Sequence, residues 1–545
     1  MTLQDLQKRV LKAYPRAIAH LRRQVNDKRF GLILGAGISK NFKIPLWKAL
    51  IKNIADDPKV SGSQVIKGHA RQASFPYKTE LLFQHFRKKQ TKIRGVKELS
   101  REQENEIYAD WLRICADHIY ANSPKDFAKA LDVHPYMMSL LPLIQGSHIT
   151  VNFNFDDFLE HALSIKKRDH DKGNRGFETV TNPWPQFRRK NCVIYHPHGI
   201  FPEGLMELPT DRFVFSEAGY ANKYIGQDGH DSSFLLIHFA RHTCLIIGCS
   251  LEDSLRNVLI RSAYVNPGNY HYFVHFIRDP KKISDAEKRA IADTNFNVYN
   301  LITLFLSEEE IDAFLGLISP DGVSDADLKD LARRCSTSLN YYYYLTGPLG
   351  VGKSTTTSLL RNLFVLDEWL EKRPAVLGKP WDKLTKAEKV EADTWIINQF
   401  GAKNDTLRRE LAPGAVAIVD RPPLDPLAFT EKRERSAKAK ALLDRLCPDR
   451  QWGVVEGVII LLTGDCKELS IRLKATGRNE YTEAKLKKMQ HDLSKIYQGD
   501  GVERIETCGL SVIEVTKKVA QIVHLGAYKP FQLTNTLKTF AGEKA

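Results

Sequence analysis

Short apolar runs that alternate with longer amphipathic segments recur along the chain. In the N-terminal part these runs begin at Phe30, His148, Cys192, Thr243 and His271. A buried strand reads as a short continuous apolar run, and strands separated by helical segments are typical of a parallel sheet covered by helices. The pattern therefore predicts an α/β domain built on a doubly wound parallel sheet.

Two other stretches have helical patterns. Residues 76–145 are rich in charge and in apolar positions at helical spacing, without a strong strand pattern. The first 25 residues predict one amphipathic helix rather than a signal peptide. We therefore expect the sheet domain to contain a helical subdomain at 76–145.

A second α/β pattern follows a turn-rich segment at 319–325. Three apolar runs come after it, YYYYL at 341–345, AVAIVD at 415–420 and GVIILLTG at 457–464. A chain of 545 residues also exceeds the roughly 250–300 residues that one hydrophobic core serves. We therefore predict two domains, at 1–325 and 336–545.

Composition narrows the class of protein. Hydrophobic residues make up 43% and charged residues 27%, which argues against extensive disorder. No 18-residue apolar stretch occurs, so we expect no membrane span and a cytoplasmic location. The eight cysteines include no CxxC pair, which argues against structural zinc and a disulfide framework. The net charge of +15 suits nucleotides, but no nucleic-acid-binding module accompanies it, so nucleic acid is not an expected partner.

A glycine loop, GAGIS at 35–39, follows the first apolar run. A Gly-x-Gly turn between a strand and a helix lets backbone N–H groups approach a pyrophosphate. Three further polar segments follow later strands, NFD at 154–156, HPHG at 196–199 and GCSLED at 248–253. The four segments together indicate a nucleotide-binding site far more specifically than the glycine loop does alone.

These four segments, in this order, resemble the SIR2 (sirtuin-like) superfamily over roughly residues 25–320. The resemblance implies a Rossmann-like domain that binds NAD⁺. It implies that the pyrophosphate is lined by Gly35, Ala36, Gly37 and Ser39, the ribose or adenosine side by Gly248 and Ser250, and the nicotinamide ribose by Asn154, Asp156 and His198.

The chemistry of these residues suits cleavage of the nicotinamide N-glycosidic bond. That reaction passes through an oxocarbenium-like state at C1′, so it needs polar groups that position the ribose and a base for the nucleophile. Asn154 can hold a water or a ribose hydroxyl, and His198 can accept a proton because imidazole titrates near neutral pH. The alternative is that Asn154 caps a helix and His198 packs in a turn. His196, which lacks a following glycine, is interpreted as structural.

The chain departs from protein-deacylating sirtuins, because the four zinc cysteines of those enzymes are missing. It is more similar to the SIR2-domain NAD⁺-cleaving effectors of bacterial antiphage defence, in which water is the acceptor. That resemblance implies a sensor domain, a phage-derived trigger and a homo-oligomer.

The second glycine loop, GPLGVGKS at 347–354, fits the P-loop pattern G-x(4)-G-K-[ST] completely. In such a loop the backbone cradles phosphates, Lys353 reaches the β- and γ-phosphates, and the Ser354 hydroxyl can ligate Mg²⁺. We expect ATP or another (d)NTP with Mg²⁺ here, bound also by Gly347, Gly352 and Thr355. The alternative is a degenerate loop that is retained for packing.

The segment DRPPLDPLAF at 420–429 resembles thymidylate-kinase-like and deoxynucleoside-kinase-like enzymes, over about residues 338–528. The resemblance implies a three-layer α/β P-loop domain in which Asp420 lies near the metal and Arg421 holds the phosphate of an acceptor such as a (d)NMP. It nominates Arg472 and Arg478 as phosphate clamps of a lid. The alternative is that these two arginines are solvated on a charged helix.

Three functions follow from the two sites. The first is an NAD⁺ glycohydrolase in antiphage defence, gated by the nucleotide-binding domain. The second is a nucleoside or nucleotide kinase whose SIR2-like domain only binds a ligand, and the third is a non-catalytic, nucleotide-gated assembly protein. The first is preferred, because the N-terminal segments carry every group that its reaction needs, and a lysine deacylase comes last.

Overall fold

The computed structural model describes the chain in two compact units. Outside the described residues lie positions 1, 68–70, 148, 170–175, 182–191, 204–213, 216–218, 220–229, 252, 280–281, 380, 410–413, 449–452 and 544–545. They include two residues of the predicted segments, His148 and Glu252. The first unit comprises Met1–Gln7, Gln24–Ser262 and His271–Val323, and the second comprises Lys8–Arg23, Ala263–Tyr270 and Ser324–Ala545. The domain limits expected from the sequence stay a prediction, because compactness alone does not define an independently folding domain.

The first unit is built on a seven-stranded parallel sheet with the order β3-β4-β2-β1-β5-β6-β7. The strands are β1 (Phe30–Leu34), β2 (Ile149–Asn152), β3 (Phe177–Val180), β4 (Cys192–Tyr195), β5 (Thr243–Ile247), β6 (His271–Phe276) and β7 (Leu301–Leu306). All five predicted strands are confirmed. The sequence interpretation missed β3, which is half-exposed and weakly apolar, and β7, whose apolar run LITLFL was left unassigned.

Alternate residues of these strands pack against helices. Cys244 and Ile246 of β5 and Val193 of β4 share one core with residues of α10 (His230–Arg241) and α11 (Asp253–Val265). Burying one such aliphatic side chain contributes roughly 1.5–3 kcal/mol. The strands β1 and β5 are buried along their whole length and lie at the centre of the sheet.

The remaining helices of the first unit include the expected helical subdomain. Residues 76–145 contain four helices and no described strand. Ser100 starts the second of them with a capping box to Gln103, which satisfies backbone N–H groups at that helix end. The helices are α3 (Trp47–Asp56), α4 (Phe75–Ile93), α5 (Arg101–Tyr120), α6 (Phe127–Val133), α7 (Pro135–Gly146), α8 (Phe158–Asp169), α12 (Asp285–Tyr299) and α13 (Glu308–Ile318).

The N-terminal segment differs from the expectation. One continuous helix was predicted, and the structure has two, α1 (Leu3–Ala13) and α2 (Pro15–Asn26). The prediction was wrong because a proline disfavours helical backbone at the residue before it, here Tyr14.

The second unit is built on a five-stranded parallel sheet with the order β12-β11-β8-β10-β9. The strands are β8 (Asn340–Thr346), β9 (Phe364–Leu366), β10 (Ala415–Asp420), β11 (Val458–Thr463) and β12 (Val502–Glu506). The three predicted strands, β8, β10 and β11, are confirmed. The two missed strands are the sheet edges, and neither reads as a continuous apolar run of ordinary length, since β9 has three residues and β12 is VERIE.

The second unit contains helices on both sides of this sheet, together with α14 (Asp325–Arg334), which precedes β8 in the chain. The other helices are α15 (Lys353–Leu359), α16 (Lys386–Arg409), α17 (Asp425–Phe429), α18 (Arg435–Leu446), α19 (Cys466–Ala475), α20 (Glu483–Ile496), α21 (Val512–Leu525) and α22 (Leu533–Ala541). One core joins α16, α18 and α22 to β10 and β11 through residues such as Leu407, Leu442, Leu537 and Ile459.

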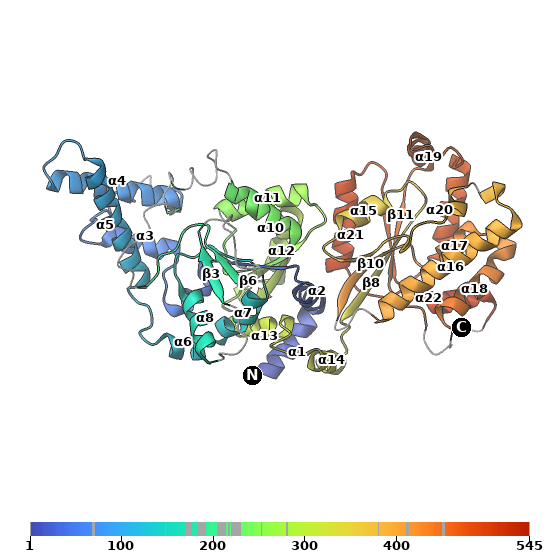
Figure 1. Cartoon of the computed structure of the whole chain (residues 1–545), viewed down its shortest axis with the longest axis horizontal. Helices are drawn as coiled ribbons and strands as arrows, with labels where there is room; N and C mark the ends of the chain where they lie inside the picture. Colours follow the sequence, from blue (N-terminus) through green and yellow to red (C-terminus); the bar gives the residue numbers. More distant parts are fainter. Residues whose placement is uncertain are drawn as a thin grey trace. The chain divides into compact units, whose positions relative to one another are not determined.

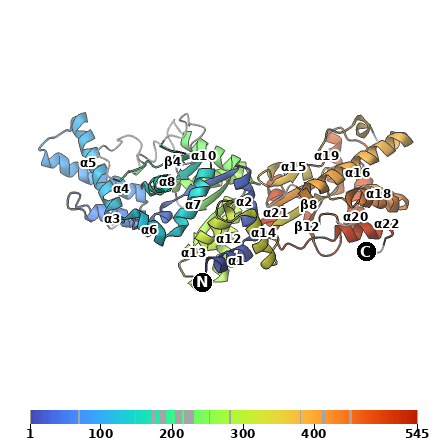
Figure 2. The ribbon, with the colours of Figure 1, turned by 60° about the horizontal axis from the view of Figure 1, so that its bottom comes forward.

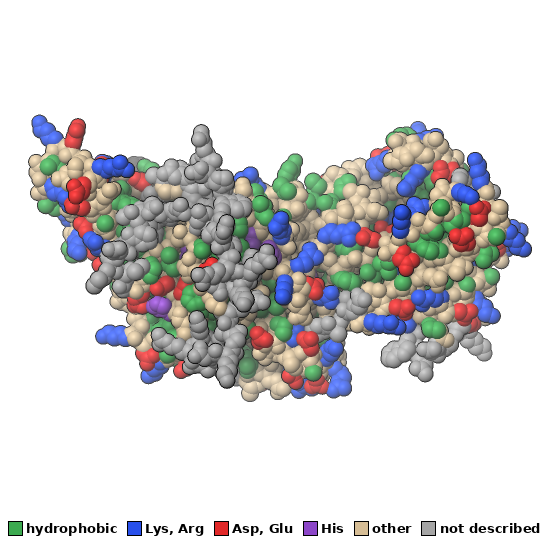
Figure 3. Space-filling view, viewed as in Figure 1, with side chains coloured by type: hydrophobic (Ala, Val, Ile, Leu, Met, Phe, Trp, Pro, Cys, Tyr) green, Lys and Arg blue, Asp and Glu red, His purple; other side chains and the backbone are tan. Residues whose placement is uncertain are grey.

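Each unit is thus a parallel sheet with helices on its faces, as Figures 1 and 2 show, and the predicted α/β fold class is confirmed. Within the described part of the chain, none of the helices is long and apolar enough to cross a membrane. On the face drawn in Figure 3, Lys and Arg side chains of the second unit are interspersed with Asp and Glu side chains rather than gathered in one patch.

Candidate functional site

The first sheet has a switch point beside β1. This strand pairs with β2 on one side and with β5 on the other, so the chain winds outward in both directions from there. In open parallel sheets, ligands bind in the crevice beyond the carboxyl ends of the strands at such a point. All four predicted segments follow strands of this sheet, after β1, β2, β4 and β5, and therefore lie at its carboxyl edge.

The glycines of the first and fourth segments let two loops touch. The Gly37 N–H donates to the Gly248 carbonyl at 2.8 Å. A Cβ atom at Gly37 would lie 2.7 Å from the Gly248 Cα atom, and one at Gly35 would lie 2.7 Å from the Cys249 Cα atom. Gly248 also has a positive φ of 71°. The close packing of the two loops therefore explains why glycine occupies positions 35, 37 and 248. Gly37 and Ser250 are exposed, and Ala36 is half-exposed.

The glycine loop does not run straight into an α-helix. It continues as two short 3-10 turns, Ala36–Ile38 and Lys40–Phe42, and α3 begins only at Trp47. The buried Tyr136 hydroxyl of α7 donates to the Ile38 carbonyl at 2.6 Å and fixes the first turn. The expected arrangement of strand, tight turn and helix start is therefore interrupted, and no α-helix N-terminus lies directly at this loop.

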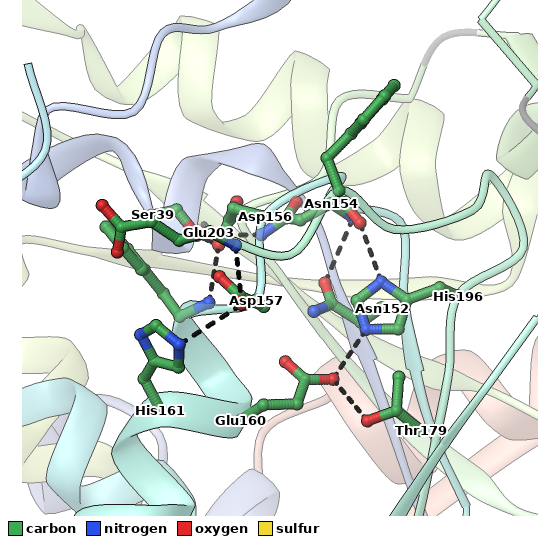
Figure 4. Close-up of polar contacts among 12 residues, drawn as sticks. Ser39, Asn152, Asn154, Asp156, Asp157, Glu160, His161, Thr179, His196 and Glu203 are labelled. Atoms are coloured by element: carbon green, nitrogen blue, oxygen red, sulfur yellow. Dashed lines mark hydrogen bonds and ion pairs between the residues drawn. The ribbon is translucent and has the colours of Figure 1, made fainter. Parts of the chain in front are cut away.

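Three predicted residues of the first site are in direct contact (Figure 4). The Ser39 hydroxyl donates to Asp156 Oδ1 at 2.8 Å, and Asn154 Nδ2 donates to the Ser39 hydroxyl at 3.1 Å. Each of the three side chains is at least 98% buried, with 1–2% exposed. The Asn154 Oδ1 atom is buried and has no hydrogen-bond partner among the described residues. A buried amide oxygen without a partner is an acceptor that a ligand can satisfy.

Asp156 has an altered acidity. Burial raises its pKa to about 6, against the lowering effects of the hydrogen bonds from Ser39 and from the Phe158 N–H. Above neutral pH the group is therefore mostly an anion. A buried carboxylate with a raised pKa beside an unpartnered amide is the kind of site that carries chemistry.

His198, the predicted base, lies beside the same segment. Its ring is 5.1 Å from the Phe153 ring and 6.0 Å from the Phe155 ring, and these two phenylalanines flank Asn154 in sequence. Its carbonyl accepts a hydrogen bond from the Val214 N–H at 3.0 Å. His198 is half-buried, so it lies at the edge of the polar cluster.

Next to this cluster lies a buried pair, His196, which the sequence analysis interpreted as structural, and Glu160, which it missed. His196 is completely buried, and its ring lies between the Asn154 carbonyl and Glu160 Oε1, at 2.9 Å from each. The Thr179 hydroxyl also donates to Glu160 Oε1, at 3.0 Å. Glu160 lies four residues after Asp156, in the first turn of α8, and nothing in the sequence pattern linked it to His196.

The second glycine loop lies after β8, at the point where β8 pairs with both β10 and β11. Gly347, Gly350 and Gly352 have φ values of 149°, 78° and 100°, which favour glycine. A Cβ atom at Gly347 would also lie 2.4 Å from the Leu462 carbonyl oxygen. The buried Lys353 ammonium group donates to the Gly347 and Pro348 carbonyls at 2.9 Å, so it lies folded over the loop.

A hydroxyl and a carboxylate face one another at this loop. The Ser354 hydroxyl donates to Asp420 Oδ2 at 3.3 Å, and the neighbouring Thr355 is exposed. Asp420 Oδ1 is buried without a hydrogen-bond partner among the described residues. Hard oxygen ligands of this kind fit Mg²⁺, which Ser354 and Asp420 would hold together with phosphate oxygens.

Arg421 lies in a buried ionic network that the sequence did not reveal. Its guanidinium group contacts Glu368 at 2.7 Å and Asp425 at 3.3 Å. The ammonium group of Lys403 donates to the Asp420 carbonyl at 2.6 Å. Burial lowers the pKa values of Lys353 and Lys403 to about 8. Glu368 and Lys403 are therefore site residues that the motif could not identify, whereas Asp425 lies inside the DRPPLDPLAF segment but was given no role there.

The two predicted lid arginines have different surroundings. Arg472 forms a half-exposed ion pair with Glu468 at 2.7 Å, one turn away on α19. Arg478 is exposed in the turn after this helix. The positive charges of Arg478 and Arg421 both lower the pKa of Tyr481, which burial raises overall. The lid role of these two arginines stays a prediction, since Arg472 is paired with Glu468 on its own helix and Arg478 is exposed.

Comparison with known proteins locates one family resemblance. Residues 148–299 match the family described as the SIR2-like domain, which indicates NAD-related enzyme chemistry in general. No curated protein matches the chain. Among solved structures, thymidylate kinase from Candida albicans is 16% identical, with a TM-score of 0.30, and covers 36% of this chain and 100% of its own. NadR in complex with NR is 11% identical, with a TM-score of 0.25, and covers 74% of this chain and 94% of its own. These two structural likenesses are too distant to bear on function. What the comparisons show is a region, residues 148–299, that is similar to SIR2-like domains.

Proposed function

We propose that the protein is an NAD⁺ glycohydrolase that depletes NAD⁺ in antiphage defence and is gated by a nucleotide bound at the second glycine loop. The observation that carries this proposal is the buried contact of Ser39, Asn154 and Asp156, with Asn154 Oδ1 unpartnered among the described residues. This cluster lies at the switch point of a parallel sheet, and two of its three residues fall within the SIR2-like region.

The proposed reaction breaks the C1′–N bond of the nicotinamide ribose. The bonding electron pair goes to the pyridinium nitrogen, which becomes neutral as nicotinamide leaves. The oxygen of a water molecule bonds to C1′, and His198 or Asp156 accepts the proton, so that the products are nicotinamide, ADP-ribose and a proton. Asn154 Oδ1 would accept a hydrogen bond from this water or from a ribose hydroxyl, and the Asp156 anion would favour the developing positive charge.

The need for a gate follows from the chemistry, because an unregulated enzyme of this kind would consume the NAD⁺ of its own cell. The second glycine loop supports nucleotide binding through Lys353, Ser354 and Asp420. Phosphate oxygens offer the Lys353 ammonium group charged partners in place of the carbonyls that it contacts here. Binding would therefore reorganise the loop.

The helix α2 and the segment after it connect the second unit to the strand that ends at the first glycine loop. Within the second unit, the Arg16 guanidinium group donates to the Tyr343 hydroxyl at 2.9 Å and the Val523 carbonyl at 2.7 Å. His20 lies 3.0 Å from the carbonyl of Asn362, shortly after the helix that begins at Lys353. Residues 24–29 alone separate this part of α2 from β1, which ends at the first glycine loop.

The test is an NAD⁺ cleavage assay with purified protein across a panel of Mg²⁺-bound (d)NTPs and (d)NMPs. We expect one of these nucleotides to switch on the release of nicotinamide and ADP-ribose. Asn154→Ala and His198→Ala should abolish cleavage and keep nucleotide binding, while Lys353→Ala should lose the response to nucleotide. The proposal fails if wild-type protein leaves NAD⁺ intact with every nucleotide and with phage lysate.

A kinase is the second candidate, and the ionic network around Arg421 favours it. Such a network, with Glu368 and Asp425 holding the guanidinium group, can orient an acceptor beside bound ATP. This candidate predicts transfer of labelled phosphate from ATP to a (deoxy)nucleoside or (d)NMP, abolished by Lys353→Ala and unaffected by Asn154→Ala. No transfer to any acceptor of the panel would rule it out.

A further inference from the structure

We propose that Glu160 and a protonated His196 form a buried ion pair that positions Asn154 for NAD⁺ cleavage. The inference rests on the proposed function and adds two positioning residues to it. His196 and Glu160 do not need to touch the substrate, because the pair acts through the backbone of Asn154 (Figure 4).

Hydrogen-bond counting requires the proton. The two ring nitrogens of His196 lie 2.9 Å from two acceptors, a carbonyl oxygen at Nδ1 and a carboxylate oxygen at Nε2. A neutral imidazole has one N–H group and can donate only one of these bonds, whereas an imidazolium donates both. Glu160 Oε1 also accepts the hydroxyl of Thr179 at 3.0 Å, and a carboxylate oxygen is a stronger acceptor of two hydrogen bonds than a carboxylic acid, which favours the proton on the imidazole.

The surroundings favour the charged pair. Glu160 comes from α8, His196 from the end of β4 and Thr179 from β3, so three elements fix its geometry. Among the described residues, the charged groups with the largest effect on His196 are Glu160 and Asp156, and both are acidic. Together with the hydrogen bond to Asn154, they raise the pKa of His196 although complete burial opposes the charge.

The pair completes the anchoring of Asn154. The Asn154 N–H donates to Asn152 Oδ1 at 3.1 Å, its carbonyl accepts from His196 at 2.9 Å, and its side-chain amide donates to Ser39 at 3.1 Å. Only Oδ1 is left without a partner among the described residues. Loss of the His196 bond would let this oxygen move, and a displacement of about 1 Å can slow a reaction on the order of 100-fold.

The sign of the pH dependence follows from this arrangement. Both hydrogen bonds exist while His196 is protonated, and one is lost when pH rises through its raised pKa. Cleavage should therefore fall on the alkaline side. In Glu160→Gln, one amide N–H group can donate to Nε2 of a neutral imidazole, which keeps its Nδ1–H group for the Asn154 carbonyl. The second amide N–H group can donate to the Thr179 hydroxyl, which then acts as the acceptor. This variant keeps both contacts and removes the need for a charge.

The experiment compares pH profiles of kcat and KM for NAD⁺ in wild type, Glu160→Gln, Glu160→Leu and a control. The activating nucleotide is kept saturating at every pH, so that weaker nucleotide binding at alkaline pH does not contribute to the decline. The control is His118→Gln, which breaks a half-buried histidine–carboxylate pair with Asp57 elsewhere in the first unit. We expect Glu160→Gln to stay within about threefold of wild-type kcat near neutral pH and to lose the alkaline decline. Glu160→Leu should lose at least about tenfold in kcat with little change in KM, and His118→Gln should follow the wild type.

A second readout separates this inference from the proposed function. In protein with ¹⁵N-labelled histidine, assigned with His196→Asn, both ring nitrogens of His196 should carry protons near pH 7, whether or not NAD⁺ is cleaved. A neutral ring there overturns the inference, as does an unchanged alkaline decline in Glu160→Gln. If wild type never cleaves NAD⁺, the proposed function fails, and the nitrogen spectrum still decides the protonation state of the pair.

Discussion

Nucleotide binding at the second glycine loop should take up protons. Burial lowers the pKa values of Lys353 and Lys403 to about 8, so each is about nine-tenths ammonium at pH 7 and about one-tenth at pH 9. Phosphate oxygens beside the lysines restore the charged form. The bound state therefore holds more protons than the free state, and affinity falls as pH rises through about 8.

The size of the effect follows from these fractions. Each lysine that contacts phosphate weakens binding about tenfold between pH 7 and pH 9, and both together weaken it about 100-fold. At pH 8 each lysine is about half protonated when free, so the pair takes up about one proton for each nucleotide bound.

Isothermal titration calorimetry with a non-hydrolysable Mg²⁺–ATP analogue measures both quantities. Titrations at pH 8 in buffers with different ionisation enthalpies give the number of protons, and Kd values at several pH values give the slope. Lys353→Met and Lys403→Met should each remove about half of the uptake, whereas the exposed Lys518→Met should not change it. An affinity that varies less than about twofold from pH 7 to pH 9, with no proton uptake, would refute the reasoning.

Three substitutions test other contacts. Ser39→Ala removes the hydroxyl between Asn154 and Asp156. It should lower the free energy of unfolding in urea by about 1–3 kcal/mol and reduce the rate of NAD⁺ cleavage. If neither quantity changes, the proposed role of the Ser39 contacts is contradicted. Gly37→Ala places a Cβ atom 2.7 Å from the backbone of the loop after β5, so binding of an NAD⁺ analogue should weaken while ATP-analogue binding stays intact in calorimetry. Arg16→Ala removes donors from backbone carbonyls at the end of α21 and should destabilise the second unit by about 1.5–3 kcal/mol; a hydrogen-exchange pattern that does not change in α21 would contradict this contact.

The centre of each sheet was predictable from the sequence, and the edges were not. Central strands such as β5 and β10 are buried on both faces, so their apolar runs are unmistakable. The edge strands β3 and β12 carry charged or half-exposed residues, because one side faces solvent. The edge strand β7 is the exception, since its run LITLFL is apolar and almost entirely buried and was readable from the sequence. The break between α1 and α2 was also readable at Pro15, although the helical pattern obscured it.

In the candidate sites too, some residues could be predicted from the sequence and others could not. Residues inside contiguous motifs, such as Ser39 and Asp420, could be named because loop chemistry is local. The partners that complete each site could not, since Glu368 contacts Arg421 from 53 residues away and Glu160 contacts His196 from 36 residues away. Such contacts depend on which strands become neighbours, and one sequence without its fold does not supply that information.

Cleavage of NAD⁺ by the purified 545-residue chain is the most direct test of the account. The measurement is the rate of nicotinamide and ADP-ribose release, with and without Mg²⁺-bound nucleotides, for wild type and Asn154→Ala. The account predicts release that depends on a nucleotide and on Lys353, and that disappears in Asn154→Ala. Release that persists in Asn154→Ala, or NAD⁺ that stays intact under every condition, would contradict it.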